Sequence, residues 1–135
     1  MKRLIVLMIA MLALGVSAYS QAIRNANNST LATISSNGEV RNSYNSLIAT
    51  ISSNGDVRDA NNRLIARLDG GTVRNANNSS LGGISSDGTV RNSSNSFLGR
   101  VYDDGAVRDA NNRLIGYAKG VPTKYAALFF FFNLF

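Results

Sequence analysis

The chain lacks several residue types that catalytic and metal sites need. Its 135 residues include no cysteine, no histidine, no tryptophan and a single proline. These absences exclude a Ser-His-Asp triad, a cysteine nucleophile, a zinc site with nitrogen and sulfur ligands, and any disulfide. We therefore expect a protein that is not an enzyme and that uses no cofactor and no metal ion. The length allows one small domain, which packing and hydrogen bonds alone must stabilise.

Acidic residues are also scarce, with 8 Asp and Glu against 14 Lys and Arg and a net charge of +6. A basic surface can bind nucleic acid, but proteins that bind single strands also offer aromatic side chains on which bases stack. Five of the six phenylalanines lie in the last seven positions, so the rest of the chain offers few such platforms. We expect no nucleic-acid partner.

Residues 1–20 have the pattern of a secretory signal peptide. Lys2 and Arg3 precede the apolar segment Leu4–Ala13, and small residues up to Ser20 provide a cleavage site. The apolar run is short for a membrane-spanning helix, which needs about 20 residues, so we favour cleavage after Ser20 over an uncleaved anchor. The mature protein would then be periplasmic, associated with the outer membrane, or extracellular.

The middle of the chain, residues 21–120, is a tandem repeat. Six units of about 17 residues begin at Ile23, Val40, Val57, Val73, Val90 and Val107. In every unit position 1 is Ile or Val, position 2 is Arg, position 6 is Asn, position 10 is Ala or Gly, and position 12 is apolar. The segment Val57–Ile65 recurs unchanged as Val107–Ile115, so units 1–3 and units 4–6 form a duplicated cassette.

Two turn signals divide each unit into two short strands. Ser36-Asn37-Gly38 and its equivalents suit a three-residue hairpin loop with left-handed Gly, and Asp103-Asp104-Gly105 fits this pattern better than a calcium site. In the third unit, a one-residue deletion leaves Gly70-Gly71 as a two-residue loop. The register places position 12 of each unit opposite position 1 of the next, as in Ile34 and Val40, with the small position 10 on the same buried face.

The second turn of each unit, at positions 5–7, is rich in asparagine. Asparagine tolerates the left-handed backbone conformation and bonds nearby backbone groups. We therefore interpret the repeated Asn at position 6 as structural rather than as a ligand for a glycan or an ion.

The arginines at position 2 are the most distinctive chemical feature of the repeat. A closed ring would arrange them as a circle of positive charge, which could bind an anion. The candidate anion-binding residues are Arg24, Arg41, Arg58, Arg74, Arg91 and Arg108. The alternative is a solvated outer face. Strand alternation would put positions 2, 4, 9 and 11 on one face, where the Arg stems would shield the Leu or Ile at position 9.

The carboxyl-terminal segment, residues 121–135, is apolar and carries Phe129, Phe130, Phe131, Phe132 and Phe135. An exposed run of this kind would promote aggregation. We favour a tail that fills the axis of the ring, where positions 10 and 12 leave an apolar lining. The alternatives are association of these phenylalanines with the outer membrane or with another chain, and an outer-membrane assembly signal at Phe135. The last conflicts with strands that are too short and polar for a lipid-facing barrel.

With this amino-terminal signal, tandem copies of the Val73–Gly88 sequence and a terminal Phe run, the chain resembles the 5-fold β-flower proteins, small secreted proteins common in Bacteroides and its relatives. The resemblance covers essentially all of the chain after residue 20. It implies an all-β fold in which short hairpins form a closed ring around a central axis, and it implies no biochemical activity and no catalytic residue.

Two points of architecture stay open at this stage. The family name implies five-fold closure, whereas the duplicated three-unit cassette favours six-fold closure, with the first strand pairing with the last as in propellers. The alternative fold is a β-solenoid with one unit per rung, which would need a cap at each end.

From these features we expect an exported, non-enzymatic β-repeat protein with a structural or interaction role. The alternative is an envelope-associated binding module that holds an anionic glycan or lipopolysaccharide through the repeated arginines.

Overall fold

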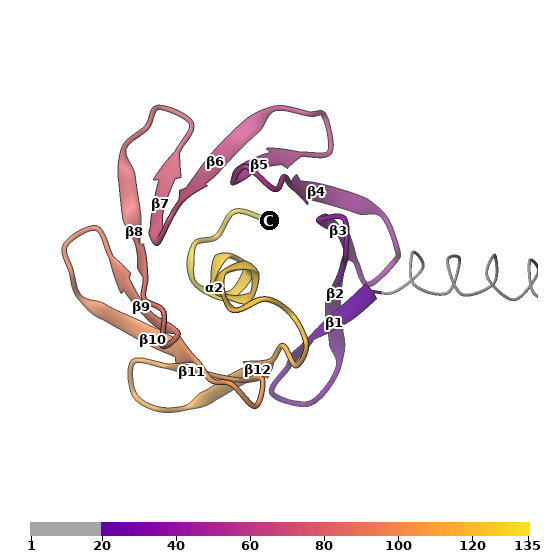
Figure 1. The fold of residues 1–135 in the computed structure, drawn as a ribbon. Coiled ribbons are helices and arrows are strands. Elements are labelled where there is room, and N and C mark those ends of the chain that lie inside the picture. Colours follow the sequence, from indigo (N-terminus) through magenta and orange to yellow (C-terminus); the bar gives the residue numbers. More distant parts are fainter. Residues whose placement is uncertain (1–19) are drawn as a thin grey trace, which may run out of the picture.

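The computed structural model of the protein describes residues 20–135, so the predicted signal peptide lies outside the described residues apart from Ser20. Twelve short antiparallel strands form one closed ring, and a helix lies on its axis (Figure 1). The strands are β1 (Ser20–Asn25), β2 (Thr30–Ser35), β3 (Glu39–Asn42), β4 (Leu47–Ile51), β5 (Asp56–Asp59), β6 (Leu64–Asp69), β7 (Thr72–Asn75), β8 (Ser80–Ile84), β9 (Thr89–Asn92), β10 (Phe97–Val101), β11 (Ala106–Asp109) and β12 (Leu114–Tyr117), and the helix is α2 (Thr123–Phe131).

The ring consists of six hairpins, which we call petals 1 to 6 in chain order, from β1–β2 to β11–β12. The Asn-rich turn of each petal points outward (Figure 1). The Gly turns join neighbouring petals, and β1 pairs with β12 to close the ring. The structure therefore confirms the closed ring of hairpins rather than a solenoid, and it answers the question of closure with six petals.

The register between petals is the one that the sequence predicts. Position 12 of one petal faces position 1 of the next in the pairs Ile34–Val40, Ile51–Val57, Leu68–Val73, Ile84–Val90 and Val101–Val107. The Gly at the turn has a left-handed backbone at Gly38, Gly55, Gly88 and Gly105, with φ from 89° to 97°. Asp69 pairs with Thr72, so Gly70-Gly71 is the expected two-residue loop.

Positions 1, 10 and 12 make up the wall that faces the axis. The side chains at position 1 are fully buried in every petal, and so are Ala32, Ala49 and Ala66 at position 10. Gly82, Gly99 and Gly116 take that place in petals 4 to 6 and are buried as well. Three apolar positions per unit are thus enough to line the ring, because the petals share one core instead of each having its own.

The simple alternation of faces fails at position 9, which we had expected to share the outer face with the arginines. A bulge occurs in every petal at this point, so that Val40 pairs with Ala49 while Arg41 pairs with Leu47. Ile48, the extra residue, packs against the core. A bulge bends and twists a strand, which lets the inner half of each petal follow the axis while the tip turns away from it. Consecutive apolar residues at positions 8 and 9, as in Leu64-Ile65, were a sequence signal for it in four of the six units; petals 1 and 4 have Thr30 and Ser80 at position 8.

A backbone bond also closes the base of each petal, from the end of its second strand to the Gly turn before its first strand. The N–H of Ile51 donates to the carbonyl of Gly38 at 2.8 Å, and the same bond recurs from Leu68 to Gly55, from Ile84 to Gly71, from Val101 to Gly88 and from Ala118 to Gly105. A Cβ on Gly38 would overlap the carbonyl oxygen of Ile51. Glycine is therefore required at this turn for close approach as well as for its positive φ.

The apolar tail fills the axis, as the sequence analysis favoured, and it does so as the helix α2, which the analysis did not predict. Ala126, Ala127 and Leu128 are completely buried. The start of the helix is held by Lys124, whose Nζ donates to the carbonyl of Gly70 at 2.9 Å. Among the described residues no helix has both the length and the apolar character needed to cross a bilayer.

The phenylalanines of the tail meet the half of the ring that has glycine at position 10. A Cβ on Gly116 would lie 2.6 Å from Cε1 of Phe130, and a Cβ on Gly99 would lie 2.6 Å from Cε1 of Phe131. A Cβ on Gly82 would lie 3.0 Å from Cε1 of Phe132. The surface suggested for a membrane or a second chain at Phe129–Phe132 is therefore packed against the core, and Phe135, 38% exposed, is the most accessible of the five.

Adjacent glycines on β8 test the close packing of the wall. We expect Gly82→Ala to lower the free energy of unfolding by about 1–3 kcal/mol, because its φ is +150° and a Cβ would overlap the carbonyl oxygen of Arg91. Gly83→Ala is the matched control. The nearest atom to its Cβ is the Gly71 carbonyl oxygen at 3.4 Å, so the change should stay within about 0.5 kcal/mol. Urea unfolding measures the free energy of unfolding of both variants. Equal losses in Gly82→Ala and Gly83→Ala would contradict the packing described.

The role of α2 as the axial core can be tested at Leu128. Leu128→Ala should cost about 2–5 kcal/mol of unfolding free energy, because it leaves a cavity in the centre of the ring. Phe135→Ala, at the exposed end, should cost only the stacking with Phe129, whose ring centroid lies 5.8 Å away, or about 0.5–1.5 kcal/mol. A small loss of thermal stability in both variants would show that the helix does not fill the axis in solution.

Candidate anion-binding arginines

Every petal tip is built by the same bonds from a side chain to the backbone. In petal 1, Oδ1 of Asn25 accepts hydrogen bonds from the N–H groups of Asn27 and Ser29, both at 2.9 Å. Asn42, Asp59, Asn75, Asn92 and Asp109 accept the equivalent pair in the other petals. Asn28 then reverses the chain with φ of 69°, and its equivalents have φ of 65° to 69°. The left-handed backbone expected for the Asn at position 6 is therefore confirmed, and the side-chain bonds to the backbone come from the residue at position 3.

The position-2 arginines lie at equivalent places around the ring, and each is bonded to its own petal tip. Nη1 of the arginine donates to the carbonyl of the position-6 asparagine at 3.1–3.2 Å in all six petals. The pairs are Arg24–Asn28, Arg41–Asn45, Arg58–Asn62, Arg74–Asn78, Arg91–Asn95 and Arg108–Asn112. The guanidinium groups are thus fixed in position, with further N–H donors remaining on each.

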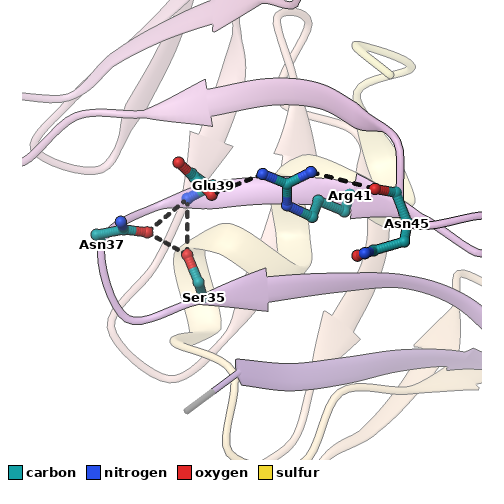
Figure 2. Close-up of polar contacts among 5 residues, drawn as sticks. All are labelled: Ser35, Asn37, Glu39, Arg41 and Asn45. Atoms are coloured by element: carbon teal, nitrogen blue, oxygen red, sulfur yellow. Dashed lines mark hydrogen bonds and ion pairs between the residues drawn. The ribbon is translucent and has the colours of Figure 1, made fainter. Parts of the chain in front are cut away.

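In petal 2 a carboxylate shares the arginine. Figure 2 shows Arg41 between Glu39 and Asn45, with 3.1 Å from Nη2 to Oε1 of Glu39 and 3.1 Å from Nη1 to the Asn45 carbonyl. The Gly turn before it is held by Ser35, whose Oγ donates to Oδ1 of Asn37 and accepts from the Glu39 N–H at 3.1 Å. An anion would have to compete with Glu39 for this guanidinium.

Carboxylates also neutralise the arginines of petals 3 and 4, but not those of the other three. Nη2 of Arg58 lies 3.7 Å from Oδ2 of Asp56, and Nε of Arg74 lies 3.8 Å from Oδ2 of Asp69. Within residues 20–135, Arg24, Arg91 and Arg108 have no carboxylate oxygen within 4.0 Å. Because β12 pairs with β1, these three belong to consecutive petals, namely 5, 6 and 1.

A fourth arginine adds to this side of the ring. Arg100 lies directly opposite Arg108 across β10 and β11, and no described carboxylate forms an ion pair with it. Its guanidinium carbon lies 4.8 Å from the ring centroid of Tyr102, and its Nε donates to the carbonyl of Asp87 at 3.1 Å. We call Arg24, Arg91, Arg100 and Arg108 the cationic arc.

The six arginines are equivalent in the repeat pattern, although the sequence also contains a signal for their difference. The residue just before position 1 lies on the same strand face as the arginine. It is Glu39 or Asp56 in petals 2 and 3, but Ala22, Thr89 and Ala106 in petals 1, 5 and 6. The structure places all six candidate residues at equivalent positions around the ring, and three of them have a carboxylate oxygen within 4.0 Å, although Arg58 shares the carboxylate of Asp56 with Arg67.

Two carboxylates of the turns are held in the ionised form by backbone donors. The pKa of Asp59 is lowered chiefly by the Arg63 N–H, which donates to Oδ1 at 2.9 Å, and further by the Asn61 N–H and the charge of Arg63. The pKa of Asp87 is lowered chiefly by the Thr89 N–H, at 3.0 Å, with a smaller contribution from the charge of Arg100.

The petal tip at Asp59 should make the protein sensitive to acid. Because the pKa of Asp59 is lower in the folded protein, its contribution to stability is complete above the ordinary value of 3.8 and is lost as the pH falls through the folded pKa. Asp59→Asn should preserve the tip at neutral pH, since Asn fills this place in four petals, and should reduce the loss of stability below pH 3.8. Urea unfolding at several pH values measures this loss.

The reciprocal variant Asn42→Asp provides the control for that experiment. It should add a carboxylate to an equivalent tip and make stability fall more steeply in acid. If both variants follow the wild-type pH dependence, the bonds to Oδ1 do not stabilise the ionised side chain.

Comparison with known proteins agrees with the geometry of the ring. Neither the search of curated proteins nor the search of solved structures found a match. A family model described as "5-fold beta-flower protein" matches residues 20–134, which include all twelve strands and the axial helix. The match covers most of the chain, even though the ring in this member has six petals. The chain therefore belongs to the 5-fold β-flower family.

Proposed function

We propose that the protein is an exported, non-enzymatic binding module whose cationic arc binds an anionic glycan. The observation that carries the proposal is the uneven neutralisation of otherwise equivalent arginines. Carboxylates pair with the position-2 arginines of petals 2 to 4, whereas those of petals 5, 6 and 1 have none within 4.0 Å among the described residues. A purely structural use of the arginine, to hold the petal tip, would not require this difference.

The arginines of the arc suit anion recognition because they are fixed in advance. Arg24, Arg91 and Arg108 are each tied to an asparagine carbonyl through Nη1, and Arg100 is tied to the Asp87 carbonyl through Nε, so little conformational entropy remains to be lost when a ligand binds. Arginine presents a planar set of donors that matches a carboxylate or a phosphate. The Arg100–Arg108 pair places two like charges opposite each other, an arrangement that an anion would relieve.

The export and the non-enzymatic character rest on other features. Lys2, Arg3 and the apolar segment after them support a signal peptide, and so a partner in the cell envelope or outside the cell. Apart from the arginines, the residues that recur at positions 3 and 6 of every unit have structural roles. The Asn or Asp at position 3 accepts two backbone N–H bonds, and the Asn at position 6 supplies the left-handed turn.

Binding to polygalacturonate and to lipopolysaccharide micelles tests the proposal with two matched triple variants. Arg24→Gln/Arg91→Gln/Arg108→Gln removes charges of the arc, and Arg41→Gln/Arg58→Gln/Arg74→Gln removes the paired arginines. Both lose three bonds to asparagine carbonyls, so they control for stability. We expect the first to weaken binding at least about tenfold and the second less than about threefold. Raising the salt from about 0.01 M to 0.15 M should weaken wild-type binding, because the Debye length falls from about 30 Å to about 8 Å.

The two probes distinguish the sources of the anion. Binding to polygalacturonate alone indicates carboxylates of an acidic polysaccharide, and binding to lipopolysaccharide alone indicates phosphorylated sugars. Equal losses in the two triple variants would show that the arc has no special role. No binding to either probe at low salt would overturn the proposal and leave a structural role.

A further inference from the structure

The groove between petals 4 and 5 differs from the other junctions of the ring. At five junctions the residue opposite the position-2 arginine has a side chain, namely Thr33, Thr50, Arg67, Arg100 or Tyr117. Opposite Arg91 it is Gly83. This is also the junction that follows the shortened turn, and Gly71 and Thr72 from that turn line the same groove. Two departures from the repeat therefore meet at one place.

The result is a hollow of about 330 Å³ beside Arg91, which is within the range of about 300–1,000 Å³ usual for ligand sites. Gly82 and Gly83, which have no side chains, are among the residues that line it. Nothing but the Gly71 carbonyl oxygen, at 3.4 Å, would meet a Cβ on Gly83. A side chain at this position would therefore extend into the hollow, as the threonines and arginines do at the other junctions.

The chemistry of the lining is one cation surrounded by neutral polar groups. Arg91 is the only charged residue in the lining, which also includes the hydroxyl groups of Ser80, Ser85 and Ser93 and the side-chain amide of Asn92. Oδ1 of Asn92 accepts two backbone N–H groups, which leaves its NH₂ to donate. Arg91 is held from two sides, by the Asn95 carbonyl at 3.2 Å and by the Phe97 ring, whose centroid is 5.9 Å from the guanidinium carbon.

Two other hollows that contain a basic residue are less suited to an anion. The groove of about 320 Å³ between petals 6 and 1 holds Arg24 and Lys119 together with the carboxylate of Asp104. The hollow of about 280 Å³ at the start of α2 contains Lys124, whose ammonium already donates to the Gly70 carbonyl. The groove at Arg91 combines a guanidinium, no carboxylate in its lining, and several hydroxyl groups.

We propose that the groove between petals 4 and 5 is a subsite for one carboxylate-bearing sugar residue of an acidic polysaccharide. Arg91 receives the carboxylate, since a single planar guanidinium matches it with two parallel bonds. The serines and Asn92 receive the sugar hydroxyls, and Gly83 leaves room for the sugar ring. A phosphate, with its larger charge, would favour a site with more than one cation. This inference rests on the proposed function. It adds the class of ligand, a uronic acid, and the location of its binding site, the groove between petals 4 and 5.

Trigalacturonic acid is the probe, with calorimetry on protein produced from the full-length chain at low ionic strength. We expect Arg91→Gln and Gly83→Thr each to weaken binding at least about tenfold. Thr is present at the equivalent position in petals 1 and 2, so the ring accepts it. Arg41→Gln is the matched control, because Arg41 makes the same bond to its tip and has Thr33 opposite it. It should change the affinity by less than about twofold. Neutral galactose trimer should not bind.

The outcomes separate this inference from the function on which it rests. If the wild type binds the uronic-acid trimer, and both Arg91→Gln and Gly83→Thr bind it with the same affinity, then the proposed subsite is wrong while the proposed function stands. If the trimer, polygalacturonate and lipopolysaccharide all fail to bind at low salt, both are overturned. Should Gly83→Thr unfold, Arg91→Gln decides together with NMR shifts of the Gly71 and Gly83 amides, which must move on addition of the trimer.

Discussion

The hydrogen bond from one petal to the Gly turn before it sets the geometry on which the rest of the structure depends. The carbonyl of Gly38 accepts the N–H of Ile51, two strands further along the chain, and the bond recurs at the following turns. It holds the two inner ends of a petal together at the axis, where a side chain on the glycine would not fit. The width of each petal at the axis is set by this contact, and the pairs between petals, together with the β1–β12 pair, then close the ring around α2.

A single helix cannot reproduce the symmetry of the ring that surrounds it. The sequence is a cassette of three units used twice, but a helix with a run of Phe presents different side chains to the two halves. Petals 1 to 3 have Ala at position 10, and petals 4 to 6 have Gly where the rings of Phe130, Phe131 and Phe132 approach. The two halves of the ring therefore differ at position 10, which is where the Phe side chains of the helix contact the wall. This difference defines one orientation of the helix about the axis.

The sequence predicted the features that are local or that repeat. The left-handed Asn and Gly turns, the two-residue loop at Gly70-Gly71 and the pairing of Ile34 with Val40 all follow from turn chemistry and period-2 alternation. Six-fold closure was favoured by the duplicated cassette but stayed open against five-fold closure, because it depends on a small angle between petals that accumulates around the ring. The bulge at position 9 was missed because alternation was applied across it. The helix was missed because a run of Phe has strand propensity, although Pro122 and Ala126-Ala127-Leu128 suit a helix.

The sequence predicted which arginines belong to the candidate site, but not which of them lack a carboxylate partner. Strand periodicity places the six arginines on one circle, and the structure does so. Which of them keep an uncompensated charge depends on neighbours across the strands, such as Asp69 beside Arg74. The hollow at Arg91 depends on Gly83, a residue unremarkable in a glycine-rich chain until it is found opposite the arginine. In a repeat protein the departures from the consensus are thus more informative about function than the consensus itself.

The position of the helix at the end of the chain also has a consequence for the order of folding. The core of the ring is completed by Ala126, Ala127 and Leu128, and the strand that closes the ring, β12, comes just before them. During synthesis, the earlier petals therefore have neither a closed ring nor a filled centre, and single hairpins are marginal in water. The closed ring with a filled centre can form only once β12 and α2 have joined the earlier petals.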